Sequence, residues 1–150
     1  MTEHVEEWKP GVTWEPSVPD AVLLSRDDGR AVLALNAQDD DPDQRSVVFV
    51  WTGVKAASMG GPNDEALAGH RLYERGLRDV LWVGVVRDSE FLDQLEKQNR
   101  VHPGHNPEQF AGLTHHVFPL KESTVEVVAR QVRVNRIDGS TDQAAVSALG

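Results

Sequence analysis

The sequence predicts a single α+β domain over residues 1–150, built on a mainly antiparallel sheet of about six strands with one main helix packed on one face. Several apolar segments have the length and composition of strands, whereas a single amphipathic segment is long enough to predict a firm helix. Most links between the strands are hairpin-length or irregular. A parallel sheet would need a helix in every crossover, and the sequence does not supply these helices.

Composition sets the broad class of the protein. A chain of 150 residues with 39% hydrophobic and 26% charged residues is near globular averages, which excludes wholesale disorder and a fibrous protein. A net charge of -9 argues against nucleic acid or an anionic membrane as a partner. The absence of cysteine excludes disulfides and metal-thiolate sites, so any metal would be held by His and carboxylates.

The two ends of the chain carry weaker signals. The acidic start resembles no secretory signal, and no apolar run reaches the roughly 18 residues of a membrane span, so we expect a cytoplasmic protein. Residues 1–20 mix Pro and Gly with Trp8 and Trp14, which predicts an extended arm. The arm is expected to pack on its own sheet; the alternative is insertion into a neighbouring subunit, giving a homo-oligomer. Residues 139–150 are expected to form a frayed tail.

Six segments of the sequence are predicted to be strands. They cover 21–26, 31–35, 46–54, 79–87, 114–120 and 123–134. The first two flank Asp27-Asp28-Gly29 and predict a hairpin. Segments 46–54 and 79–87 are apolar on both faces, so we expect two central strands that pair side by side. His115 and His116 are adjacent on a strand and must point to opposite faces.

The helix signals are local. Ser89 is a predicted N-cap for a helix through about Gln98, whose apolar side chains fall on one face. Asn106-Pro107 predicts the start of a short helix. Asn63 or Asp64 could cap another short helix that ends at Gly69.

Two long links, 54–79 and 99–114, hold the residues suited to chemistry. Long ordered links are usually functional, and we expect these two to meet at one end of the sheet as a polar pocket. The candidate catalytic residues are His70, His105, Asp64 and Glu65, and the candidate ligand-binding residues are Asn63, Arg71, His102 and His116.

Two kinds of chemistry fit these residues. In the first, His70 or His105, oriented by Asp64 or Glu65, moves protons to and from a small substrate. In the second, His70, His102 and His105 hold zinc, iron or manganese, although the spacing matches no His-x-His motif on a strand. The serines, including Ser58, Ser89 and Ser123, lack the Gly-x-Ser-x-Gly nucleophile elbow. Arg71 suits an anionic ligand, or pairing with surface carboxylates.

The second half of the chain carries a combination of short motifs. They are Gly61-Pro62-Asn63-Asp64-Glu65-Ala66, Gly69-His70, Val101-His102-Pro103 followed by His105, and the segment 115–128. With these motifs the chain resembles a group of uncharacterised bacterial proteins. It departs from their pattern at Met59-Gly60-Gly61-Pro62, where an aromatic-Gly-Pro-Pro opening is expected. The resemblance implies no activity, cofactor or partner.

The resulting functional prediction is a protein that handles a small polar molecule in a His/carboxylate pocket, with acid/base or metal chemistry if it is an enzyme. The sequence features fit both an enzyme and a non-catalytic binding protein. The alternative is a non-catalytic interaction module in which the two links form an interface, with Trp8 and Trp14 as anchors.

Overall fold

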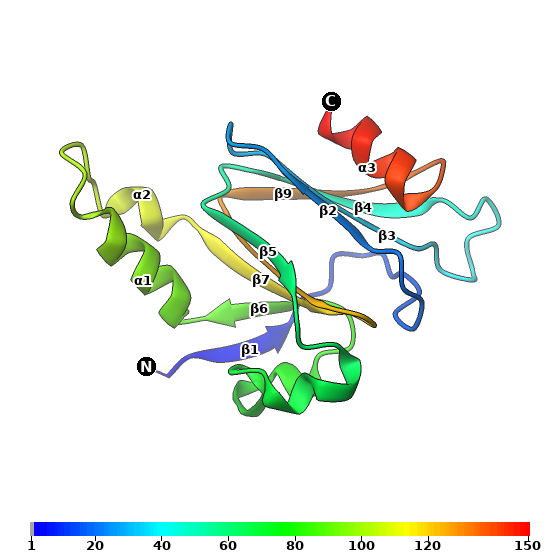
Figure 1. Ribbon diagram of the computed structural model, residues 1–150, viewed down its shortest axis with the longest axis horizontal. Helices are drawn as coiled ribbons and strands as arrows, with labels where there is room; N and C mark the ends of the chain where they lie inside the picture. Colours follow the sequence, from blue (N-terminus) through cyan, green and yellow to red (C-terminus); the bar gives the residue numbers. More distant parts are fainter. Residues whose placement is uncertain (1) are drawn as a thin grey trace.

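The computed structural model describes residues 2–150 as two antiparallel sheets that face each other, with helices on the outer sides (Figure 1). The five-stranded sheet has the order β1 (His4–Glu7), β6 (Gly84–Arg87), β7 (Thr114–Pro119), β8 (Thr124–Ala129), β5 (Ala56–Gly60). The four-stranded sheet has the order β2 (Val22–Ser25), β3 (Ala31–Leu35), β4 (Ser46–Thr52), β9 (Gln131–Ile137). The α+β class is confirmed, but the strands form two sheets where one was predicted.

The helices lie on the two outer faces. They are α1 (Glu90–Asn99), α2 (Glu108–Ala111) and α3 (Thr141–Leu149), with three short 3₁₀ helices η1 (Asp64–Gly69), η2 (Tyr73–Arg75) and η3 (Leu77–Asp79). α3 packs on β2, β3 and β4, and α1 and α2 pack over β8 of the other sheet. No helix within residues 2–150 is both long and apolar enough to cross a lipid bilayer.

The main core lies between the sheets and is rich in aromatic rings. Phe49 of β4 meets Phe118 of β7 edge-on, with ring centroids 5.0 Å apart, and Trp14 meets Phe49 in the same manner at 5.4 Å. Edge-to-face contacts of this kind stabilise a core beyond the burial of their area. These contacts join residues of both sheets and of the N-terminal arm in one cluster.

The predicted pairing of segments 46–54 and 79–87 is wrong, because β4 and β6 lie in different sheets. β6 begins only at Gly84 and lies between β1 and β7. Ahead of it, the backbone N–H groups of Leu81 and Val83 donate to the Glu7 carboxylate at 2.6 and 3.0 Å. A side chain therefore replaces strand partners there. Strands that are buried on both faces have the same continuous apolar pattern in the sequence, whichever sheet they join.

The predicted strand 123–134 is two strands, β8 and β9, in different sheets. The break falls at Arg130, whose N–H donates to the carbonyls of Thr52 and Gly53, both at 3.2 Å. Side chains alternate along β8: Val125 and Val127 enter the core between the sheets, whereas Glu126 and Val128 face outward. The outward face of β8 is therefore where the layer containing α1 and the short helices meets the sheet.

The two ends of the chain are more ordered than the sequence predicts. The N-terminal arm contains β1, and Trp14 is 1% exposed in the core, so the arm packs on its own chain. The predicted frayed tail is wrong, because α3 has a capping box in which Ser140 and Gln143 each bond the other's backbone. Ala144 and Ala145 are fully buried, and their small size lets α3 lie close on the outer face of β3 and β4.

The local helix predictions are confirmed. Ser89 caps α1 by accepting the Leu92 N–H at 3.0 Å. Asn63 caps η1, which ends at Gly69 as predicted. Asn106 accepts the Glu108 N–H at 3.0 Å at the start of α2. Each of these signals is a contact between residues three or fewer apart, which the local sequence can specify without the rest of the fold.

Candidate functional site

The candidate site is a network of polar side chains centred on Glu126, on the outward face of β8. The Glu126 side chain is 12% exposed and accepts hydrogen bonds from two imidazoles and one guanidinium. His115 Nε2 lies 2.8 Å from Oε1, His70 Nε2 lies 3.3 Å from Oε2, and Arg71 forks onto both oxygens at 2.7 and 2.9 Å. Four donors thus converge on one carboxylate.

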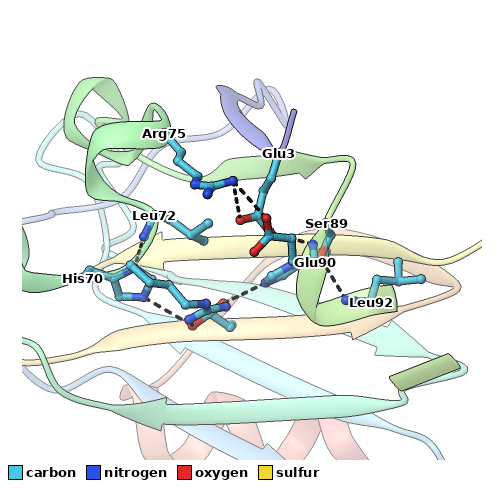
Figure 2. Close-up of polar contacts among 10 residues, drawn as sticks. Glu3, His70, Leu72, Arg75, Ser89, Glu90 and Leu92 are labelled. Carbon is cyan, nitrogen blue, oxygen red and sulfur yellow. Dashed lines mark hydrogen bonds and ion pairs between the residues drawn. The ribbon is translucent and has the colours of Figure 1, made fainter. Parts of the chain in front are cut away.

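His70 is oriented by its own turn. The backbone N–H of Leu72 donates to His70 Nδ1 at 3.0 Å, and Leu72 is itself fully buried (Figure 2). Because Nδ1 accepts, Nε2 carries the proton of the neutral ring and donates it toward Glu126. The turn between η1 and η2 therefore determines both the direction and the tautomer of this imidazole.

His115 links Glu126 to the start of α1. Its Nδ1 lies 2.7 Å from Ser89 Oγ, and both residues are buried. Ser89 Oγ accepts the Leu92 N–H, as Figure 2 shows, so its hydroxyl proton is free to point at His115 Nδ1. Since the carboxylate of Glu126 only accepts, Nε2 of His115 is the donor on the other side. The result is a directed series of hydrogen bonds, in which Ser89 donates to His115 and His115 donates to Glu126.

Arg71 covers the network from the solvent side. Its side chain is 51% exposed while its guanidinium holds both oxygens of Glu126. The guanidinium lies 6.0 Å from the Phe91 ring, and this ring also meets His115 at 5.7 Å. Hydrogen bonding to Glu126 raises the pKa of Arg71, so its positive charge is permanent. Of the groups around Glu126, Arg71 is the one within reach of a dissolved ligand.

The protonation of Glu126 follows from these contacts. Burial alone would raise its pKa, but hydrogen bonds from His115, His70 and Arg71 outweigh burial and hold the pKa of Glu126 well below its usual range. Glu126 is therefore ionised in the folded protein and is too weak a base to take protons near neutral pH. Proton transfer in this site must involve an imidazole.

A second cluster of polar side chains lies next to the Glu126 network, at the start of α1. Glu3 Oε2 accepts the Glu90 N–H at 2.7 Å, and Arg75 Nη1 lies 3.5 Å from Glu3 and 3.1 Å from Glu90, as Figure 2 shows. A cavity of about 550 Å³ opens here. Its lining consists of Thr2, Glu3, Arg75, Asp88, Glu90 and Asp93. The cavity is therefore lined by Asp88 and Glu90, the two neighbours of Ser89 in the sequence.

His116, a candidate ligand-binding residue, lies in a different environment. It faces the core between the sheets, where its ring stacks on Trp8 at 4.7 Å and its Nδ1 accepts the Trp51 indole N–H at 3.4 Å. Burial, with a smaller contribution from the neighbouring His115, lowers the pKa of His116 to about 4. The placement on opposite faces is as predicted, and it makes His116 a core residue.

The other candidates of the first link have structural contacts. Asn63 Oδ1 accepts the Ala66 N–H at 3.2 Å as the cap of η1. Asp64 pairs with Lys121 at 3.0 Å, and Glu65 is exposed. Of the predicted site residues, the structure therefore brings together His70 and Arg71. The carboxylate that orients His70 is Glu126, where Asp64 or Glu65 was expected.

The expected meeting of the two links does not occur. In Figure 1, the turn after α1 lies at the opposite end of the outer layer from the short helices of the first link. His102 Nδ1 accepts the Gly104 N–H at 2.9 Å within its own turn. His105 Nδ1 accepts from the Asn99 amide at 2.8 Å, and its Nε2 lies 2.9 Å from Glu96. These contacts orient both imidazoles within the second link and α1.

The arrangement of residues 2–150 does not support the metal site that the sequence suggested. Within residues 2–150, no group of three or more His, Asp or Glu side chains is arranged to hold a metal ion. The three candidate ligands divide between the two separated links, with His70 on Glu126 and with His102 and His105 beyond α1.

Sequence reasoning missed Ser89 as a partner of His115, and it missed Glu126 altogether. A signal for Glu126 was present, because it is a single carboxylate on the outward face of a strand whose neighbours are apolar. The partner of that carboxylate depends on the register of β7 against β8, which places His115 opposite Val128 and two positions from Glu126.

Comparison with protein-family models, curated proteins and solved structures gives no match for this chain.

Proposed function

We propose that the protein handles a small polar molecule at the Glu126 network, as an enzyme that uses acid/base chemistry at His115. The observation that carries the proposal is the buried His115 ring, held between a hydroxyl at Nδ1 and an ionised carboxylate at Nε2. When Nδ1 takes up a proton, the ring becomes an imidazolium, and the adjacent carboxylate stabilises that charge. A buried base with such a partner suits proton transfer.

Arg71 is the reason to expect that the ligand carries an anionic group. Its guanidinium is half-exposed and already presents its forked donors to a carboxylate, the arrangement by which Arg recognises carboxylates and phosphates. A ligand carboxylate or phosphate could share these donors with Glu126 from the solvent side. His70 would keep Glu126 in place meanwhile, since its ring is fixed by Leu72.

The rival proposal is a non-catalytic interaction module anchored by Trp8 and Trp14. It has less support, because Trp14 is buried in the core and Trp8 stacks on His116. Both indoles therefore have partners within the chain. A homo-oligomer that uses the arm would have to exchange β1 or present other residues, and a measurement of molecular mass in solution tests it directly.

A thermal-shift screen tests the proposed function. The purified protein is screened against small carboxylates, small phosphates and divalent ions, since a ligand that binds the folded state raises the Tm by mass action. The screen is repeated on His115→Gln, Glu126→Gln and Arg71→Ala, with His105→Gln as the matched control outside the network. We expect an anion-induced shift that these three substitutions reduce and His105→Gln retains. A shift that survives all three substitutions, or no shift with any compound, contradicts the proposal.

A further inference from the structure

We propose that Ser89 is a nucleophile and that the site carries out acyl transfer on small carboxylic esters or thioesters. This inference deepens the proposed function and rests on it. It starts from the order of the hydrogen bonds, because a hydroxyl, an imidazole and a carboxylate in one directed chain are the parts of a nucleophilic triad. Here Ser89 Oγ and His115 Nδ1 are 2.7 Å apart, and His115 Nε2 and Glu126 Oε1 are 2.8 Å apart.

The ring nitrogens are used in the reverse of the usual order, and the chemistry is unchanged by this. Such triads are recognised by geometry and roles, and either nitrogen of a neutral imidazole can be the base when the other one donates. Glu126 fixes the tautomer, because its ionised carboxylate requires a donor at Nε2 and so leaves the lone pair at Nδ1 facing Ser89.

The reaction balances without an oxidant or a metal. Ser89 Oγ forms a bond to the acyl carbon while its proton passes to His115 Nδ1. The bond to the leaving alcohol or thiol then breaks, and His115 returns the proton to that group, which leaves an acyl-serine. Water then attacks the acyl carbon while one of its protons passes to His115 Nδ1. The bond between the acyl carbon and Ser89 Oγ breaks, and His115 returns the proton to Ser89 Oγ, so the products are a carboxylic acid and an alcohol or thiol.

The start of α1 supplies a place for the negative charge of the intermediate. Ser89 is the N-cap of this helix, so the amides of the first turn lie beside its oxygen. The Leu92 N–H donates to Ser89 Oγ and the Glu90 N–H donates to Glu3. Phe91 is the residue between them in the first turn of the helix. We assign the Phe91 N–H as the donor to the developing oxyanion.

Glu3 governs access to this end of the helix. Glu3 is 5% exposed, its carboxylate accepts the Glu90 N–H, and it lines the cavity that both sequence neighbours of Ser89 also line. Ser89 is itself 6% exposed, and we assign to the Glu3 side chain the role of admitting a substrate to Ser89 from this cavity. Glu3 immediately precedes β1, and movement of its side chain would break its bond to the Glu90 N–H and its contact with Arg75. Substitution of Glu3 by Ala should therefore increase the reactivity of Ser89.

The absence of cysteine from the chain gives a direct test. Ser89→Cys and Ser140→Cys each place a single thiol at the N-cap of a helix, since Ser140 caps α3 in the same manner. Within residues 2–150, the hydrogen bonding of the Ser140 side chain is to Gln143 and includes no imidazole. Any effect of the helix on the thiol is shared by the two variants. The rate of alkylation by iodoacetamide is measured from about pH 5 to pH 9, after both variants are shown to be folded.

We expect the Ser89→Cys thiol to react at least about tenfold faster than the Ser140→Cys thiol near pH 6, because His115 favours its thiolate. His115→Gln and Glu126→Gln in the Ser89→Cys background should each remove this advantage, and Glu3→Ala should increase it. Ser140 is exposed and Ser89 is buried, so accessibility acts against the expected result. Equal rates, or a faster Ser140→Cys thiol both with and without the Glu3→Ala substitution, overturn the inference.

A second measurement uses the natural serine. The unmodified protein and its Glu3→Ala variant are treated with a fluorophosphonate, and the labelled residue is identified by peptide mass spectrometry. We expect the label on Ser89, with none after Ser89→Ala and an unchanged label after Ser140→Ala. A label on another residue, or none in either protein, counts against a nucleophilic Ser89. If the anion-induced thermal shift nevertheless depends on His115 and Glu126, the acid/base site stands and only the acyl-transfer step falls.

Discussion

His115 and His116 are neighbours in the sequence, yet their rings lie on opposite faces of β7 and have opposite surroundings. His115 bonds to Ser89 and Glu126 on the outer face, whereas His116 stacks on Trp8 at 4.7 Å between the sheets. Strand geometry alone requires the two directions. The layer that covers each face decides the chemistry of its ring. The polar ends of α1 and η1 lie over the face of His115, whereas indole rings lie against His116.

This arrangement predicts the tautomers of two histidines. His70 and His115 should both carry their proton on Nε2, because Nδ1 accepts from the Leu72 N–H in one case and from Ser89 in the other. Long-range ¹H–¹⁵N spectra of the side chains distinguish the tautomers. A proton on Nδ1 of neutral His115 would remove the path by which Ser89 gives up its proton, and would contradict this prediction.

Loss of the Glu126 charge should destabilise the fold. Glu126→Gln leaves Arg71 without its ion pair and gives His70 and His115 a poorer acceptor, so we expect the free energy of unfolding to fall by about 2 to 4 kcal/mol. Urea denaturation at neutral pH measures this change. Glu122→Gln, an exposed carboxylate in the turn before β8, should have little effect. Equal losses in the two variants would show that the network contributes no more than a surface charge.

His116 should make stability depend on pH. Its pKa is lowered from 6.5 to about 4 in the folded protein, so the unfolded chain binds the proton more readily. The contribution of neutral His116 is therefore complete above pH 6.5 and is lost as pH falls through about 4. The whole effect amounts to about 3 kcal/mol.

Denaturation curves at several pH values test this dependence. In His116→Gln, which keeps an acceptor for the Trp51 indole, stability should fall less steeply across that range than in the unmodified protein. Both proteins lose the stabilising effect of ionised Glu126 at low pH, so this loss cancels when the two are compared. An identical pH dependence in the two proteins would contradict a neutral, buried His116.

The C-terminal helix should contribute measurably to stability through its cap. Ser140→Ala removes the side-chain oxygen that accepts the Gln143 N–H at 3.2 Å, so we expect a loss of about 1 kcal/mol. Ser147, an exposed serine on the same helix, is the matched control, and Ser147→Ala should be neutral or slightly stabilising. If both variants are as stable as the unmodified protein, α3 is frayed in solution.

Local features of this protein could be predicted from its sequence. The β2–β3 hairpin, the Ser89 cap of α1, the Asn63 cap of η1 and the opposed rings of His115 and His116 each depend on residues close together in the chain. Such features follow from turn chemistry, capping and the period of a strand, which act over a few residues. His70 and Arg71 were also identified as site residues, because of their chemistry and their place in a long link.

Only the tertiary structure decided which strands share a sheet and which carboxylate His70 meets. β4 and β6 have the same apolar pattern, and β8 runs almost directly into β9, so no local signal assigns them to separate sheets. Glu126 lies 56 residues from His70 and 37 from Ser89 in the numbering of the chain. Contacts over such distances depend on sheet register and on the packing of helices over the sheet, where many small burial energies act together.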